Sequence, residues 1–179
     1  MKLENIKTLG ELKKSGYESK SIKDELRHNL REKIKTGKPT FEGVHGFENT
    51  VIPELERAIF SRHNINLLGL RGQAKTRLAR KMIELLDEYI PFVTGSEIND
   101  DPLQPISRFA KDIIEIKGDE TPISWLHRND RFFEKLATPD VTVADLIVAV
   151  DPIKAANFYS SYADDRVVHS GMLPSATRC

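Results

Sequence analysis

Cysteine is almost absent from this sequence, since Cys179 is the only one among 179 residues. A single thiol forms neither an internal disulfide nor a cysteine-based zinc cage, which excludes a disulfide-stapled secreted scaffold and a zinc ribbon. No uninterrupted apolar run approaches the roughly 20 residues of a membrane-spanning helix. The first ten residues also lack the apolar core of a signal peptide. We therefore expect a cytoplasmic protein that does not enter a membrane.

An excess of charge of either sign is also lacking, because 27 Lys and Arg balance 27 Asp and Glu. This formal net charge of zero gives no general argument for binding nucleic acid or an anionic membrane. The charge is unevenly spread, since residues 1–40 contain eleven Lys or Arg and six Asp or Glu. Such a surplus is typical of a solvated helix face. The sequence therefore argues against a nucleic-acid partner.

Residues 21–37 have the pattern of an amphipathic helix. Apolar residues recur at every fourth position from Ile22 to Ile34, and charged or polar residues fill the other faces. Ser21 is a typical N-cap residue at the start of this pattern, and Gly37 is a typical stop.

The remainder, residues 41–179, is predicted to be the main domain, and residues 1–40 form a helical extension ahead of it. Within the main domain, a helix is expected to follow Thr50. A mostly apolar run at residues 65–70 predicts a strand that is buried on both faces. Residues 75–89 have apolar positions at helical spacing. Strand, glycine-bearing loop and helix are therefore expected in direct succession.

The pattern is weaker further along the chain. Residues 87–120 are acidic, and they resemble a surface insertion with a short helix around residues 106–116. A strand is expected at residues 121–126. The apolar run at residues 142–150 is compatible with either a helix or a strand.

The most informative stretch connects the predicted strand to the helix after it. It is close to the pattern G-x-x-x-x-G-K-[ST], in which backbone N–H groups wrap the phosphates of a nucleotide. Lys75 is expected to reach the outer phosphates, which makes it the candidate catalytic residue, and Thr76 is the candidate ligand of Mg²⁺. Ala74 replaces the usual glycine and fits if its backbone is helical. The candidate residues for binding ATP are Gly69, Leu70, Arg71, Gly72, Gln73, Ala74, Lys75 and Thr76. The alternative is a chance glycine-rich turn between a strand and a helix.

With alanine ahead of the lysine, this loop resembles the phosphate loop of MoxR-type AAA+ ATPases and of the ATPase subunit of magnesium chelatase. Residues 41–48 resemble a short element that lies against the adenine in this family, which implies that Val44, His45 and Gly46 lie beside the base. Three later segments also resemble the family's pattern, namely residues 137–140, 145–147 and 171–178.

The resemblance implies an α/β fold of the P-loop NTPase class, AAA+-like, in which helices flank a parallel sheet. It also implies that the full-length protein forms a homo-oligomeric ring that hydrolyses ATP with Mg²⁺. Hydrolysis would remodel a client or insert a metal, with a protein that carries a von Willebrand A-type domain as a possible partner. Two positions depart from the family pattern: Arg71 replaces a common proline, and Val148 replaces a glycine.

Hydrolysis further requires acidic residues at the end of a second buried strand. Residues 146–151 are five apolar residues followed by Asp151, but Pro152 stands where the catalytic acid is required. The resemblance instead places the metal-binding strand just after Cys179. We therefore expect the chain to be the front part of an AAA+ domain, which binds nucleotide weakly and hydrolyses little.

Two other interpretations stay open. One is a non-catalytic interaction module in which the basic helix at residues 21–37 docks a partner and the loop is a vestigial phosphate site. The other is a small P-loop kinase or GTPase that uses Asp151.

Overall fold

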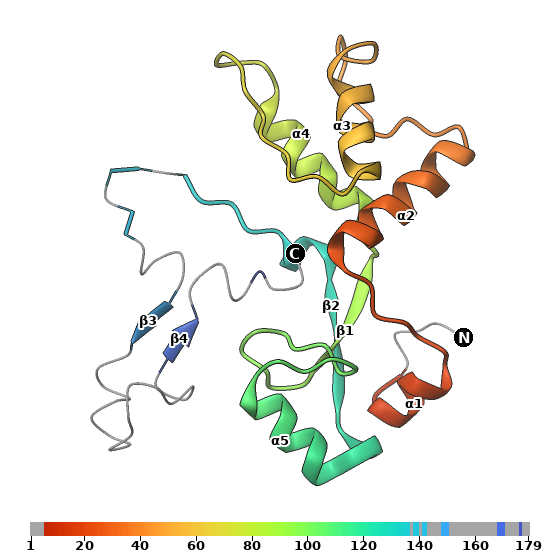
Figure 1. Cartoon of the computed structure of the whole chain (residues 1–179), viewed down its shortest axis with the longest axis vertical. Coiled ribbons are helices and arrows are strands. Elements are labelled where there is room, and N and C mark those ends of the chain that lie inside the picture. The colour runs from red at the N-terminus through yellow and green to blue at the C-terminus, as the bar shows by residue number, and fades with distance from the viewer. Residues whose placement is uncertain are drawn as a thin grey trace. The chain divides into compact units, whose positions relative to one another are not determined.

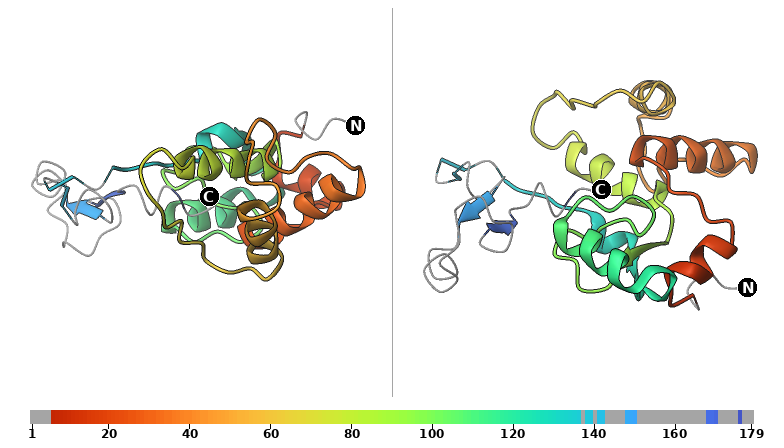
Figure 2. Two further views of the ribbon diagram at one scale, coloured as in Figure 1. Left: turned by 90° about the horizontal axis from the view of Figure 1, so that it is seen from above. Right: turned by 60° about the horizontal axis from the view of Figure 1, so that its bottom comes forward.

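The computed structural model describes residues 6–136, 138–139, 141–142, 148–150, 168–170 and 176. The chain divides into two compact units (Figure 1, Figure 2). The helical unit is Lys20–Glu88, and the sheet unit combines Met1–Ser19 with Tyr89–Cys179. The predicted domain boundary at residue 40 therefore falls inside the helical unit.

Three helices and a 3₁₀ turn build the helical unit: α2 (Ile22–Lys35), α3 (Val51–Phe60), α4 (Lys75–Lys81) and η2 (Met82–Leu85). The predicted helix at residues 21–37 is confirmed as α2, and the helix expected after Thr50 is confirmed as α3. The hydroxyl of Ser21 accepts the N–H of Asp24 at 3.2 Å, which caps α2 as its sequence predicts. Gly37, at φ +68°, follows the end of α2 in a conformation that favours glycine.

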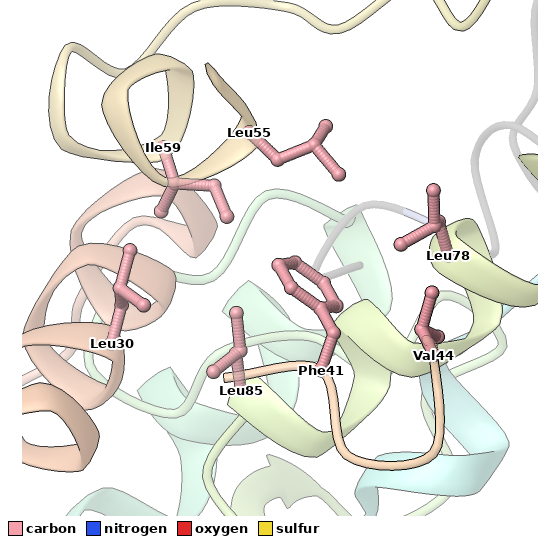
Figure 3. Packing of buried hydrophobic residues seen from close by; sticks show 7 residues of the cluster. All are labelled: Leu30, Phe41, Val44, Leu55, Ile59, Leu78 and Leu85. Carbon is pink, nitrogen blue, oxygen red and sulfur yellow. The ribbon is translucent and has the colours of Figure 1, made fainter. Parts of the chain in front are cut away.

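The core of the helical unit draws on all of these elements (Figure 3). Leu30 of α2 is fully buried and packs in one cluster with residues of the segment after it, of α3 and of α4–η2. The apolar face of α2 is thus committed to the same core that supports α4. The buried members of this cluster are Leu30, Phe41, Val44, Leu55, Ile59, Leu78 and Leu85.

The sheet unit contains the antiparallel pair β1 (Tyr89–Val93) and β2 (Ile123–His127), in register from Tyr89↔His127 to Val93↔Ile123. The predicted strand at residues 121–126 is therefore confirmed as β2, one to two residues later. Backbone bonds tie the start of the chain to this sheet, because Lys7 C=O accepts the N–H of Ile123 at 2.9 Å. The remaining elements of this unit are α1 (Leu9–Lys14), α5 (Arg108–Lys117), η3 (Gly118–Glu120), η4 (Arg128–Arg131), β3 (Val148–Val150) and β4 (Val168–Ser170).

The second strand pair, β3 with β4, is antiparallel as well. The end of the apolar run at residues 142–150 is thus a strand, and the helix predicted around residues 106–116 is confirmed as α5. The described residues form no parallel strand pair, so the parallel sheet predicted for the main domain is not among them. None of the helices in the described ranges is long and apolar enough to cross a membrane.

The strand predicted at residues 65–70 is wrong, because this segment is irregular in the structure. Ile65 and Leu67 pack against the core cluster, whereas Leu68 and Leu70 are 86% and 76% exposed. The segment therefore buries one side only, and no neighbouring strand of the described helical unit pairs with it. An apolar run predicts a buried strand only when a partner strand satisfies its backbone groups.

The predicted helix at residues 75–89 is also too long. Helical structure ends at Leu85, and Tyr89 begins β1. Two features explain the early end, one local and one from a distant residue. Pro91 disfavours a helical conformation in the residue before it. The carboxylate of Glu25, from α2, accepts the N–H of Asp87 at 2.6 Å, which holds the chain after η2 in a non-helical path.

A buried carboxylate organises the turn between β1 and α5 in the sheet unit. Asp100 is 3% exposed and accepts four hydrogen bonds. The donors are the hydroxyls of Ser96 and Ser107 at 2.6 and 2.5 Å and the N–H groups of Ile106 and Ser107 at 2.7 and 2.9 Å. Burial raises the pKa of Asp100, but the hydrogen bonds, first those of the two serines, outweigh it and hold this pKa below its ordinary value.

This arrangement predicts that the sheet unit loses stability in acid. Because the folded pKa of Asp100 is lowered, its contribution is complete above the unfolded pKa of about 3.9 and disappears as the pH falls through the folded value. Each unit of pKa difference corresponds to about 1.4 kcal/mol in the free energy of unfolding. Urea unfolding between pH 7 and pH 3, followed by Trp125 fluorescence, measures the loss. Asp100→Asn has no carboxylate to titrate and should show a flatter pH profile; an equally steep profile would contradict the assignment.

Candidate functional site

The loop ahead of α4 has a backbone that alternates in handedness. Gly72 and Ala74 have positive φ angles, +81° and +53°. Gln73 between them and Lys75 after them have negative φ angles. Alternation of this kind is typical of an anion-binding nest, in which successive N–H groups turn toward one concave side, and residues 72–75 are called the nest below. Lys75 is the first residue of α4, whose leading N–H groups have no acceptor within the helix itself. The predicted phosphate loop therefore has a backbone suited to an anion.

The ammonium group of Lys75 folds back over this loop. Its Nζ donates to the carbonyl oxygens of Gly69 at 2.9 Å and Leu70 at 2.5 Å. The N–H of Leu70 in turn donates to Oε1 of Gln73 at 2.8 Å. A positive charge thus lies against the nest, where the sequence predicts a group for the outer phosphates.

Ala74 adopts a left-handed helical conformation, with φ +53° and ψ +14°. The predicted phosphate loop requires a helical backbone at Ala74. The structure shows that this backbone is left-handed, which is the conformation that glycine adopts more easily than other residues. A residue with a Cβ atom in this conformation costs about 1–2 kcal/mol. The substitution of the usual glycine by alanine is therefore accommodated with strain.

Ala74→Gly is expected to raise the free energy of unfolding of the helical unit by about 0.5–1 kcal/mol, because relief of the left-handed strain exceeds the extra entropy of glycine in the unfolded chain. Ala79→Gly is the matched control. It places the same change inside the right-handed backbone of α4, where glycine costs about 1 kcal/mol. Urea titration followed by far-ultraviolet circular dichroism measures both, and a loss of stability in Ala74→Gly equal to that in Ala79→Gly would refute the strain.

Thr76, the candidate ligand of Mg²⁺, lies in the first turn of α4 with an exposed side chain. Arg71 at the tip of the loop is exposed as well. No group of three or more His, Cys, Asp or Glu side chains that could hold a metal ion is found among the described residues. Of these groups only the Thr76 hydroxyl has an oxygen that can ligate Mg²⁺, whereas the Lys75 ammonium and the backbone N–H groups are donors that suit the phosphate oxygens carrying the metal.

A cavity of about 410 Å³ opens beside the loop, within the helical unit. Gln73 and Lys75 line it on the side of the loop, and Asn64 and Asn66 add polar groups. The rest of the lining is largely apolar and comes from the turn ahead of α3, from α3 itself, from the irregular segment before the loop and from α4. These residues are Phe47, Val51, Glu54, Leu55, Ala58, Ile65, Leu67, Leu68 and Leu78.

The residues predicted beside the adenine lie apart from this lining. Val44 is buried in the core cluster and is 4% exposed. His45 is exposed, with its Nδ1 3.7 Å from Oε1 of Glu48, and the N–H of Gly46 donates to the same carboxylate at 2.8 Å. The neighbouring Phe47 and Val51 line the cavity instead. Phe47 belongs to the resembling segment 41–48, and the sequence signal for Val51 is the apolar face of α3 just after that segment.

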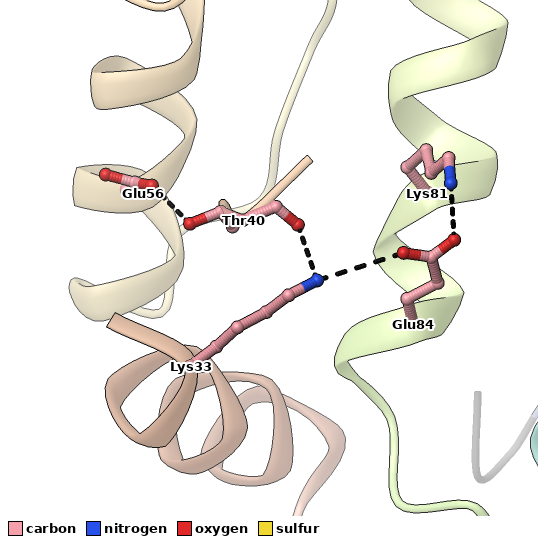
Figure 4. A network of polar contacts seen from close by, with 5 residues as sticks. All are labelled: Lys33, Thr40, Glu56, Lys81 and Glu84. Atoms are coloured by element: carbon pink, nitrogen blue, oxygen red, sulfur yellow. Dashed lines mark hydrogen bonds and ion pairs between the residues drawn. The ribbon is translucent and has the colours of Figure 1, made fainter. Parts of the chain in front are cut away.

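A polar network fixes α4 and η2 against the other helices of the unit (Figure 4). Lys33 of α2 donates to the carbonyl of Thr40 at 2.9 Å and lies 3.8 Å from the carboxylate of Glu84 in η2. Glu84 also pairs with Lys81 at 2.6 Å. The hydroxyl of Thr40 donates to Glu56 of α3 at 2.5 Å. The helix that carries Lys75 and Thr76 is therefore held from α2 and α3.

The remaining predicted positions lie mostly outside the described residues, including Asp151, residues 145–147 and most of residues 171–178. Ala137 and Asp140 also lie outside them, while Thr138 and Pro139 are described. No protein-family model, no curated protein and no solved structure matches the chain. The geometry of the loop and cavity is therefore the observation from which a function is argued.

Proposed function

We propose that the chain binds ATP together with Mg²⁺ at the loop from Gly69 to Thr76 and in the cavity beside it. The observation that carries this proposal is the alternating backbone of the loop with the Lys75 ammonium against it, open to a cavity lined by apolar side chains. A nest with a cation suits phosphates, and an apolar cavity with a few polar groups suits a planar base.

Each part of the site has one task under this proposal. The N–H groups from Gly72 to Thr76 hold phosphate oxygens, and Lys75 leaves its two carbonyl acceptors to neutralise phosphate charge. The Thr76 hydroxyl orients the metal. When bound, Mg²⁺ supplies the positive charge that offsets the phosphates. Phe47, Val51 and Leu55 exclude water from one face of the base.

The resemblance to MoxR-type and magnesium chelatase ATPases extends the proposal. The protein is then an AAA+ P-loop ATPase of the cytoplasm, whose parallel sheet lies outside the described residues. It hydrolyses ATP in a homo-oligomeric ring to remodel a client or insert a metal, with a von Willebrand A-type protein as partner. Because Pro152 stands where a second acid is required after Asp151, residues 1–179 are expected to bind nucleotide and to turn it over slowly.

A second candidate function is a non-catalytic module that docks an acidic partner through α2. The observation that favours it is a row of exposed cations, because Lys23, Arg27, Arg31 and Lys35 recur at every fourth position of this helix. Like charges at this spacing destabilise a helix slightly, so they are not there for the fold. If this second function is correct, addition of ATP should leave the affinity of the chain for its acidic partner unchanged. Under the first, reversing the charge of Arg27 and Arg31 leaves the affinity for ATP unchanged.

Isothermal titration of the full chain with ATP in excess Mg²⁺ tests the proposed site. Saturable binding of one ATP per chain is expected, with competition from tripolyphosphate at the nest and weaker binding of adenosine in the cavity. Absence of binding by both ATP and tripolyphosphate would refute the site. If tripolyphosphate does not compete with adenosine, and ATP binds no more tightly than adenosine, the site is restricted to the cavity.

A further inference from the structure

The peptide between Gly69 and Leu70 is held from both sides by side chains of its own loop. On one side the Leu70 N–H donates to Oε1 of Gln73 at 2.8 Å. On the other, Nζ of Lys75 binds the carbonyls of Gly69 and Leu70 at 2.9 and 2.5 Å. Gln73 and Lys75 therefore clamp the same piece of backbone, and the clamp keeps the ammonium group folded onto the loop.

The clamp depends on a glycine at position 69. A Cβ atom added there would lie 2.2 Å from Oε1 of Gln73 and 4.0 Å from Cδ of Lys75. Gly69 also has φ +155°, at the edge of the region that favours glycine. The carboxamide of Gln73 can therefore approach the backbone only because Gly69 has no side chain.

Both side chains of the clamp also line the cavity of about 410 Å³. A phosphate group that reaches Lys75 from the cavity must draw the ammonium from its two carbonyl acceptors. Oε1 of Gln73 is the end of the carboxamide that is held at the loop, and it is an acceptor that occupies the Leu70 N–H and has no proton to offer a phosphate oxygen; the donors of this side chain are on its N–H₂ end. The contact that Gln73 makes in this structure therefore opposes phosphate binding.

We propose that Gln73 is a gate of the phosphate site: its carboxamide closes the loop over the Gly69–Leu70 peptide and must turn away before phosphate binds. This inference rests on the proposed nucleotide site and adds a regulatory element to it. The gate divides the chain into a closed and an open population, and phosphate binds the open one. The apparent affinity equals the affinity of the open loop multiplied by the fraction of molecules whose loop is open. This factor is the same for every ligand that binds through a phosphate group.

The test compares Gln73→Ala with wild type by titrating the full chain with ATP and Mg²⁺, with tripolyphosphate and with adenosine. Loss of one exposed hydrogen bond corresponds to a factor of about 2 to 10 in the closing equilibrium. We expect the affinities for ATP and tripolyphosphate to rise by the same factor in that range. Gln73 also lines the cavity, so adenosine is the readout for that lining: its affinity should change by less than those for ATP and tripolyphosphate, because adenosine has no phosphate to meet the gate.

Gln73→Asn is the second variant, since its shorter side chain cannot span to the Leu70 N–H and should act like alanine. Asn49→Ala, an exposed amide of the same unit outside the cavity lining, should leave all three affinities unchanged. Circular dichroism should show the same helix content in every variant, and the folding equilibrium of the Gln73 variants should fall by no more than the factor of about 2 to 10 that the lost hydrogen bond contributes. A purely structural role for Gln73 would lower the folding equilibrium beyond that factor and would lower the affinities as well.

The outcomes separate the gate from the site itself. If wild type binds ATP but Gln73→Ala and Gln73→Asn bind it no more tightly, the gate is overturned and the nucleotide site stands. If adenosine gains as much as ATP, the variants change the cavity rather than the phosphate loop, and the gate is again overturned. If wild type binds neither ATP nor tripolyphosphate, the site and the gate fall together.

Discussion

Replacing Lys75 by alanine is expected to weaken binding of ATP with Mg²⁺ by about 100-fold or more. The ammonium is folded against the loop, with Nζ 2.9 Å from the carbonyl of Gly69 and 2.5 Å from that of Leu70. On phosphate it would form charge-assisted hydrogen bonds, each contributing about 1.5–3 kcal/mol. A loss of about 2.7 kcal/mol corresponds to a factor of 100 in the dissociation constant.

Isothermal titration measures this loss, and Lys38→Ala is its matched control. Lys38 is an exposed lysine of the same helical unit that lies outside the cavity lining, so its removal changes the net charge equally. A distant charge is screened by salt, and its effect on the affinity for ATP should be less than about twofold at 0.15 M ionic strength. Equal affinities of Lys75→Ala and wild type would contradict the loop as a phosphate site.

Adenosine gives the Lys75 experiment a second readout. Its affinity should be unchanged in Lys75→Ala, because the lysine acts on phosphate. A parallel loss for adenosine would show that the variant distorts the cavity rather than removing a charge.

Asp100→Ala is expected to lower the free energy of unfolding of the sheet unit by about 3–5 kcal/mol. The carboxylate is 3% exposed and accepts four hydrogen bonds from Ser96, Ile106 and Ser107. Removing it leaves buried donors without an acceptor, and the loss of one partner from such a network is strongly destabilising. Ser107 is also the N-cap of α5, so the start of that helix loosens as well.

Urea unfolding followed by fluorescence of Trp125 in β2 reports on this unit. Asp112→Ala is the control, since Asp112 is an exposed acid of α5 that lies 3.8 Å from Arg108, one turn away. An exposed pair of this kind contributes about 0.3–0.5 kcal/mol. A change in Asp100→Ala as small as that in Asp112→Ala would show that Asp100 does not organise the turn.

The elements that the sequence predicted correctly are those whose determinants are local. α2 follows from an apolar repeat of four and from Ser21, which caps it through Asp24. α5 follows from its own repeat, and Ser107 caps it by accepting the N–H of Ala110 at 3.1 Å. Each of these signals lies within four residues of the position it fixes. A local pattern is therefore sufficient to place them.

The elements that the sequence missed depend on distant partners. Residues 65–70 have the composition of a buried strand, yet no strand of the described helical unit pairs with them, and Leu68 and Leu70 remain exposed. The helix that begins at Lys75 ends early because Glu25, 62 positions before Asp87, binds the N–H of that residue. The hydrogen bonds that the buried Asp100 carboxylate accepts from Ser96 and Ser107 were not predicted either. No common sequence motif signals a buried acid bonded to two serines.

For the candidate site, the sequence by itself determined which residues meet: the spacing of Gly69, Gly72 and Lys75 defines the loop, and a helix begins at Lys75 as predicted. Only the tertiary structure decided the left-handed backbone of Ala74 and the place of Phe47 in the cavity. The physical reason is the range of the interactions. Caps and helical spacing act within one turn, whereas backbone handedness and cavity walls are fixed when α2, α3 and α4 pack on one core.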